Sequence, residues 1–188
     1  MKLLIIQGSP NPDSFCYANA NYYRRKAQKL GYDVELVDLS ESKFDPVLRY
    51  GYAKHMFDET LPKAMQTKIA AADHITFFFP IWWSAEPAVL KGWLDRVLTP
   101  KFAYQYHGRT TAKLLKGRTA SIFTTCHGPA LFYSMYGGVI SRWKHLILGF
   151  CGIKLTQHNI LGKMDSSLDS FRRRQNYMKQ CAATLLHL

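Results

Sequence analysis

Residues 77–97 read FFFPIWWSAEPAVLKGWLDRV, the most informative stretch of this chain. An apolar run over Ile75–Phe79 has the length of a buried strand, and Pro80 ends it. Pro87 stands where a helix can begin, and the apolar residues after it recur at helical spacing. The stretch therefore places Trp82-Trp83 in a loop at the carboxyl end of a buried strand, which is where ligands bind in open α/β sheets. Packing in a core or interface is the alternative for such a tryptophan pair.

The rest of the chain repeats this alternation of strand and helix. Strands are predicted at Leu3–Gln7, Val34–Val37, around Ile75, at Thr119–Thr125 and near Lys154–Ile160. Helices are predicted from Ser14 or Asp13 to about Leu30, at about Leu61–Ala72, from Pro87 to near Leu98, at about Tyr136–Phe150, and from a Ser166 or Ser167 cap to the carboxyl terminus. Asp38–Asp58 is predicted to be irregular and Pro100–Lys116 to be a polar excursion.

The alternation indicates a parallel sheet with helices on both faces. Right-handed crossovers then give a doubly wound α/β fold. Because no linker or internal repeat interrupts the pattern, a single domain over residues 1–188 is expected.

The net charge of +12, from 25 basic and 13 acidic residues, would attract polyanions or anionic small molecules. The basic residues are spread along the chain and no nucleic-acid module is visible, so no nucleic-acid partner is expected. No apolar run reaches the roughly 20 residues that span a bilayer. The amino terminus is typical of a first strand and not of a signal peptide, which favours a cytoplasmic protein.

The four cysteines, at positions 16, 126, 151 and 181, are widely spaced. Their spacing disfavours both a disulfide framework and a zinc site, so reduced thiols and no metal are expected.

The loop after the first strand, residues 8–14, carries the hydroxyls of Ser9 and Ser14. It lacks the Gly-x-Gly-x-x-Gly dinucleotide fingerprint. A helix begins just beyond it, and the free amides and dipole of a helix amino terminus bind phosphate. Helix capping by Ser14 or Asp13 is the structural alternative. Loops 8–14, 80–86 and 126–132 would meet at one edge of the sheet, and a phosphate loop beside an aromatic slot suits a flavin nucleotide.

Five motifs carry a family resemblance: Phe79–Trp83, the PxxLKGWLDRV stretch at 87–97, Phe102–Tyr106, Phe44-x-Pro46-Val47, and Thr124-Thr125 with Gly128. Together they resemble the flavodoxin-like NAD(P)H:quinone oxidoreductases, which include quinone reductase, modulator-of-drug-activity proteins and the quinone reductase-like subunits of potassium efflux systems. The resemblance covers nearly the whole chain. It implies a flavodoxin-like fold with a five-stranded parallel sheet in the order 2-1-3-4-5.

The resemblance also implies a flavin cofactor, FAD or FMN, with FAD favoured by the likeness to quinone reductase, and NAD(P)H as co-substrate. Cys16 stands where the family commonly has asparagine, and Cys126-His127 takes the place of a glycine pair, which adds bulk to the pocket. The residues expected at the cofactor are Ser9, Ser14, Phe15, Cys16, Pro80, Ile81, Trp82, Trp83, Thr125, Cys126, His127 and Gly128.

Tyr133 matches a family tyrosine near the flavin carbonyls. The histidine that usually partners it lies six residues on, where this chain has Val139, so the Tyr–His proton relay is not carried over. His127 or His107 could substitute. Tyr133 and His127 are therefore the expected catalytic residues, stabilising charge that develops during the reaction.

Tyr104 and Tyr106 match tyrosines that line a substrate slot built by two subunits, with loop packing as the alternative. The expected protein is a homodimeric flavoenzyme that reduces quinones or similar aromatic acceptors by ping-pong hydride transfer. The alternatives are a flavodoxin-type electron carrier, which the basic charge disfavours, and a regulatory subunit of a transport or nucleic-acid-binding system.

Overall fold

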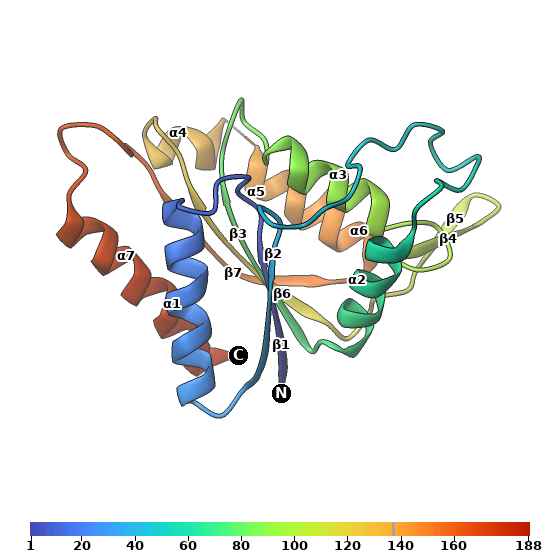
Figure 1. The fold of residues 1–188 in the computed structure, drawn as a ribbon, viewed down its shortest axis with the longest axis horizontal. Helices are drawn as coiled ribbons and strands as arrows, with labels where there is room; N and C mark the ends of the chain where they lie inside the picture. Colours follow the sequence, from blue (N-terminus) through green and yellow to red (C-terminus); the bar gives the residue numbers. More distant parts are fainter. Residues whose placement is uncertain (137) are drawn as a thin grey trace.

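Five parallel strands form the centre of the structure, a computed structural model that describes residues 1–136 and 138–188. The sheet has the order β2-β1-β3-β6-β7 (Figure 1), which confirms the predicted order of its five strands. The strands are β1 (Lys2–Gln7), β2 (Asp33–Asp38), β3 (His74–Pro80), β6 (Thr119–Thr125) and β7 (Lys154–Leu161).

Helices cover both faces of this sheet, as Figure 1 shows. Helices α1 (Phe15–Lys29) and α7 (Phe171–Ala183) lie on one face, where Tyr23 and Tyr177 pack against Leu3, Ile5 and Phe78. Helices α2 (Thr60–Ala71) and α3 (Ala88–Val97) and the segment 139–151 lie on the other. The alternation of side chains along a strand explains this, because consecutive residues of β1 and β3 enter opposite cores.

The helix predicted at about Tyr136–Phe150 is present from Val139 to Cys151, as α5 (Val139–Arg142), a π-helical stretch η1 (Trp143–Leu148) and α6 (Gly149–Cys151) in succession. It begins later than predicted because Gly138 has a φ of +61°, a left-handed value that only glycine adopts freely and that separates the helix from the residues before it. A short helix that was not predicted, α4 (Ala130–Met135), precedes it. Gly137, which the predicted helix included, lies outside the described residues.

The excursion Pro100–Lys116 holds a two-stranded antiparallel hairpin that the sequence analysis did not predict. Strand β4 (Tyr104–His107) pairs with β5 (Thr110–Lys113) through a two-residue turn at Gly108-Arg109. Gly108 has a φ of +59°, as tight hairpin turns require.

The predicted helix caps have mixed outcomes. Ser14 caps α1, with its Oγ accepting a hydrogen bond from the Tyr17 amide at 3.1 Å. The cap predicted for the last helix at Ser166 or Ser167 was wrong. Ser170 caps α7, because residues 162–169 form an extended turn before the helix begins, and a short 3-10 turn, η2 (Thr184–His187), follows it.

The irregular segment between β2 and α2 is held against α3 by two residues of the LKGWLDR motif. A Cβ on Gly92 would lie 2.3 Å from the Cβ of Pro46, so only glycine allows this close approach. The buried guanidinium of Arg96 donates to the carbonyl oxygens of Asp45, at 2.5 Å, and Asp58. The Arg96 side chain thus joins the two ends of this irregular segment.

Over the described residues, the helices are all too short or too polar to cross a lipid bilayer.

Candidate functional site

A cleft of about 370 Å³ opens at the carboxyl ends of β1, β3 and β6, where the three predicted loops meet. Trp83 and Gly128 adjoin it without lining it. The other residues expected at the cofactor all line it: Ser9, Ser14, Phe15, Cys16, Pro80, Ile81, Trp82, Thr125, Cys126 and His127. Five residues that were not among those expected complete the wall: Asn11, Asp13, Met164, Asp165 and Arg174.

The loop after β1 presents the amino terminus of α1 to this cleft. Ser14 satisfies two amides, since its Oγ accepts from Tyr17 and its carbonyl accepts from Ala18. The amides of Phe15 and Cys16 have no acceptor among the described residues, as the first turn of a helix provides none. The buried side chain of Gln7 shapes this loop by bonding both the amide and the carbonyl of Ser9. Two free amides at a helix amino terminus form an anion site.

The loop after β3 is a tight turn in a strained conformation. The backbones of Trp82 and Ala85 exchange two hydrogen bonds of 2.9 Å, and Trp83 and Ser84 between them have φ values of 50° and 56°. This is the geometry of a type I′ turn, which normally takes Asn-Gly. Left-handed non-glycine residues are costly and cluster at functional sites.

This turn carries its side chains outward. Trp83 is fully exposed and Trp82 about half exposed (49%). Packing within the chain therefore does not account for Trp83. The amides of Trp83 and Ser84 are also without acceptors in residues 1–136 and 138–188.

Glu86, which was not among the residues expected at the site, anchors the turn to the helical segment 139–151. Its carboxylate is buried, accepts a 3.0 Å hydrogen bond from Trp143 Nε1 and pairs with the Arg142 guanidinium. A buried carboxylate is tolerated only with such partners. The contact links the turn to α5 and η1. A lone acidic residue in an otherwise apolar stretch before Pro87 was the available signal.

The loop after β6 closes the cleft. The Ile81 amide donates to the Thr125 carbonyl at 2.7 Å, which joins two of the three loops. Cys16 Sγ lies 3.6 Å from Thr125 Oγ1, which joins the third. Burial raises the pKa of the Cys16 thiol to about 12, so it stays protonated and is no nucleophile. The amides of His127 and Gly128 find no acceptor in the described part of the chain.

Of the two expected catalytic residues, His127 lines the cleft and Tyr133 does not. His127 is exposed and lines the cleft. Tyr133 lies behind it on α4, where a Cβ on Gly128 would be 3.1 Å from its ring. Val139, the position where the resemblance leads one to expect a histidine, is completely buried in the apolar core and has no proton to pass. His107 lies on the β4–β5 hairpin and is not among the cleft residues.

Tyr104 and Tyr106, expected to line the substrate slot, are not in this cleft either. They lie on the hairpin at the far right of Figure 1, away from α4. Tyr104 is buried against Phe150, with ring centroids 4.9 Å apart, whereas Tyr106 is mostly exposed (62%). One chain alone does not bring these tyrosines to the cleft.

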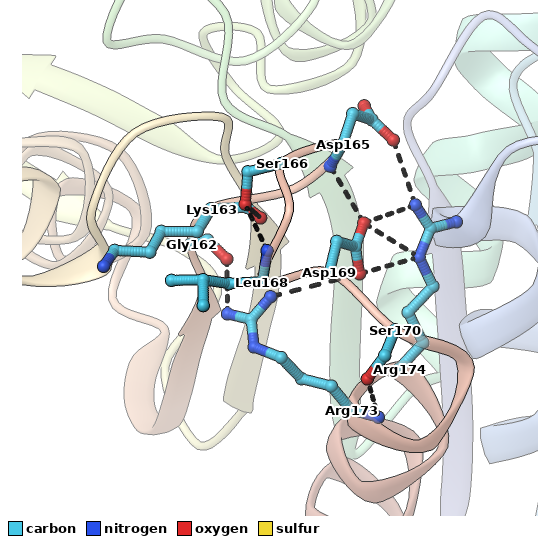
Figure 2. A network of polar contacts seen from close by, with 9 residues as sticks. All are labelled: Gly162, Lys163, Asp165, Ser166, Leu168, Asp169, Ser170, Arg173 and Arg174. Carbon is cyan, nitrogen blue, oxygen red and sulfur yellow. Dashed lines mark hydrogen bonds and ion pairs between the residues drawn. The ribbon is translucent and has the colours of Figure 1, made fainter.

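A network of charged side chains forms the remaining wall (Figure 2). Arg174, from α7, donates to the carboxylates of Asp169 and Asp165, and its guanidinium lies 5.5 Å from the centre of the Phe15 ring. Hydrogen bonds from Arg174 lower the pKa of Asp169 to about 2. The two carboxylates hold the Arg174 guanidinium in place, and this guanidinium in turn packs on the Phe15 ring. Both Arg174 and Phe15 line the cleft. Its sequence signal is the pair of aspartates just before the arginine run 172–174.

The fold defines a flavodoxin-like α/β protein, with this cleft at the carboxyl edge of its sheet. Residues 1–185 match a family model described as "Flavodoxin-like fold", and the chain belongs to that family, as an NAD(P)H:quinone oxidoreductase-like member.

The chain is 33% identical to an "Uncharacterized NAD(P)H oxidoreductase" of Haemophilus influenzae, over 92% of this chain and 89% of that protein. It is 31% identical to the human "Ribosyldihydronicotinamide dehydrogenase [quinone]", over 82% and 78%. The solved structure of Smu.1420 from Streptococcus mutans superposes with a TM-score of 0.83 at 31% identity and covers both chains completely. The resemblance deduced from the sequence is thereby confirmed.

Proposed function

We propose that this protein is a flavin-dependent NAD(P)H oxidoreductase that reduces quinones or similar aromatic acceptors in a ping-pong cycle. The observation that carries the proposal is one cleft at which three loops meet, each with a pair of backbone amides, at 15–16, 83–84 and 127–128, that have no acceptor among the described residues. The middle pair belongs to the exposed tryptophan turn that adjoins the cleft. The relatives named above are an NAD(P)H oxidoreductase and a quinone dehydrogenase, which supports the same reaction class.

The donor set fits a flavin nucleotide. The amides of Phe15 and Cys16, with the dipole of α1, would hold a phosphate. The amide pairs at 83–84 and 127–128 would donate to the carbonyl edge of the ring system, and Pro80 and Trp82 provide flat apolar walls. A bound flavin would supply the two-electron redox chemistry, which no side chain here can perform.

A second groove favours FAD over FMN. It has a volume of about 430 Å³, lies between α1 and α7, and shares Ser14, Phe15 and Arg174 with the cleft. Ala18 and Met178 give it apolar walls, so it would accommodate a purine beyond the phosphate site. An Ala18→Trp variant should weaken FAD binding and leave FMN binding unchanged, as measured by fluorescence titration of each flavin.

Two residues would handle charge during the reaction. His127, exposed in the cleft, can donate a proton or hydrogen bond to an acceptor there, and the Tyr133 hydroxyl is the second donor. The nicotinamide and the acceptor would use the same aromatic slot in turn, so neither needs a separate site. His127→Ala should lower turnover with the quinone acceptor, because it removes one of the two donors. Tyr133→Phe should cost less than the ~100-fold typical of a key oxyanion donor.

The complete site would require a homodimer. Tyr106 and the apolar side chains of α4, among them Leu131, Phe132 and Met135, are exposed on a single chain. Exposed apolar surface of this kind is typically covered by a partner, and two-fold pairing is the commonest arrangement. Pairing would bring a hairpin with Tyr104 and Tyr106 to the other subunit's cleft. A monomeric mass by light scattering at micromolar concentration would contradict this.

The deciding experiment is reconstitution. The purified protein is mixed with FAD or FMN, its visible spectrum is recorded, and NADPH oxidation is followed with a quinone acceptor. The proposal expects a retained flavin band and quinone-dependent turnover. Retained flavin without turnover would indicate an electron carrier instead, and no retained flavin with either nucleotide would refute the enzyme proposal.

A further inference from the structure

A further cavity, of about 270 Å³, is separate from both the cleft and the groove between α1 and α7. It lies at the opposite end of α3 from the tryptophan turn. Its walls come from α2, from the irregular segment between β2 and α2, and from residues 99–101 at the start of the hairpin segment. No residue that lines it also lines the cleft described above. The flavin site proposed above does not include this cavity.

The charges around this cavity are predominantly positive. Lys54, Lys63, Lys101 and Arg96 line it, and Glu59 is its one acidic residue. Within residues 1–136 and 138–188, none of the three lysines lies within 4 Å of a carboxylate. Free ammonium groups converging on one hollow focus a positive potential there.

Arg96 adds a buried positive charge at the cavity wall, with the carboxylates of Glu59, Asp45 and Asp58 near it. Its side chain is 2% exposed, and two of its nitrogens donate to neutral carbonyl oxygens. The Glu59 carboxylate is 3.7 Å away, and Nε has no hydrogen-bond partner among the described residues. A buried guanidinium normally has its charge matched by an anion. The cavity therefore combines free surface cations with a buried one.

The size of the cavity restricts the ligand. Its volume equals that of roughly nine waters, which suits a phosphate group or a compact phosphoester and is too small for a whole dinucleotide. Ammonium groups bind phosphate through charge-assisted hydrogen bonds, and His55 adds a further donor to the wall.

We propose that this cavity binds a phosphate monoester. Two sources share that chemistry, a free phosphorylated metabolite and the 2′-phosphate of NADPH. The second source is attractive because Lys101 lies just before the hairpin that carries Tyr104 and Tyr106. The anion site itself does not depend on the proposed enzyme activity.

The test is titration of the full-length protein, saturated with flavin so that the α1 phosphate site is occupied, or apo if it retains none. Inorganic phosphate, 2′-AMP and 5′-AMP are the probes, and backbone amide chemical shifts report where each binds. Saturable shifts at His55 and Gln66 are expected. Lys54→Gln with Lys63→Gln should weaken binding by about tenfold or more, since each charge-assisted hydrogen bond lost is worth about tenfold.

The matched control is Lys29→Gln with Lys154→Gln, which removes the same charge from exposed positions elsewhere. Unchanged affinity in this control supports a built site, and an equal loss would reduce the effect to net charge and overturn the proposal. Shifts confined to residues 9–16, or no saturable binding, would also overturn it. Tighter binding of 2′-AMP than of 5′-AMP supports NADPH as the source, whereas equal binding supports a free phosphate ester. Because no readout here is turnover, the result stands apart from that of the reconstitution experiment.

Discussion

The two ends of β3 are built in opposite ways. At its amino end His74 is completely buried, with Nδ1 2.7 Å from Thr119 Oγ1 and Nε2 3.0 Å from Ser121 Oγ. At its carboxyl end the turn 82–85 exposes Trp83, holds two left-handed residues and leaves amides unpaired. The polar ring of the buried histidine at the amino end is held by two hydroxyls, whereas the carboxyl end holds strained residues and open donors. The first arrangement stabilises the fold, and the second suits the ligand site proposed at that edge.

The largest effect is expected from Glu86, because it holds the strained end in place. Glu86→Ala leaves Trp143 Nε1 buried without an acceptor and Arg142 without its partner, which should cost about 3 kcal/mol of unfolding free energy. Urea unfolding measures it. Glu35→Ala is the matched control, since its ion pair with Lys68 is at the surface and contributes under about 1 kcal/mol. Equal losses of unfolding free energy in the two variants would show that Glu86 does not anchor the turn.

The amino end should be sensitive to acid. Burial lowers the pKa of His74 from 6.5 to about 4, so the unfolded chain binds the proton more readily than the folded one. The stability contributed by the neutral ring is present above pH 6.5 and is lost as pH falls toward 4, amounting to about 2 kcal/mol between pH 7 and pH 5. Urea unfolding at the two pH values measures the loss, and His74→Gln should remove most of this dependence. An unaltered pH dependence in the variant would mean that other groups cause it.

The strain at the carboxyl end should be removable with one glycine. Ser84→Gly relieves a left-handed residue that carries a Cβ and should stabilise the protein by about 1 kcal/mol. Thermal melts of the variant beside the native protein measure it. A lower melting temperature would show that the turn is not strained.

The smallest effect on stability is expected for Trp83. Because its side chain is fully exposed, Trp83→Ala should change the unfolding free energy by less than about 0.5 kcal/mol while weakening the binding of flavin or aromatic acceptor. Trp93→Ala, in the core, should cost about 3–5 kcal/mol by comparison. Chemical unfolding and flavin titration of both variants separate the roles. A stability loss at Trp83 approaching that at Trp93 would favour packing after all.

Much of the cleft was predictable because strand ends and loops follow local rules. Apolar runs such as Leu3–Gln7 and Ile75–Phe79 specify buried strands, and parallel strands necessarily bring their carboxyl-end loops together. The positions of Ser14 and Trp82 followed from that alone.

What could not be predicted depends on contacts between distant residues. Asp165 and Arg174, which pairs with Asp169, line the cleft only because α7 packs beside α1, and no spacing rule connects them to Phe15. Glu86 has meaning only with Trp143, 57 residues away. The β4–β5 hairpin has a local signal in Gly108-Arg109, but strands of four residues are too short for periodicity to identify them.

Arg96 donates hydrogen bonds to the carbonyl oxygens of both Asp45 and Asp58, and the segment between these two residues can therefore be replaced. Both ends of the intervening segment are fixed to α3 by one guanidinium, so changes in length between them alter neither anchor. Loop-closure entropy rises only by about 0.6 kcal/mol when a loop doubles in length. Insertions or replacements within residues 47–57 should therefore fold readily, and they would remodel the basic cavity while leaving the cleft at the carboxyl edge of the sheet unaltered. The same scaffold could thus change the ligand proposed for that cavity without any change to the proposed flavin site.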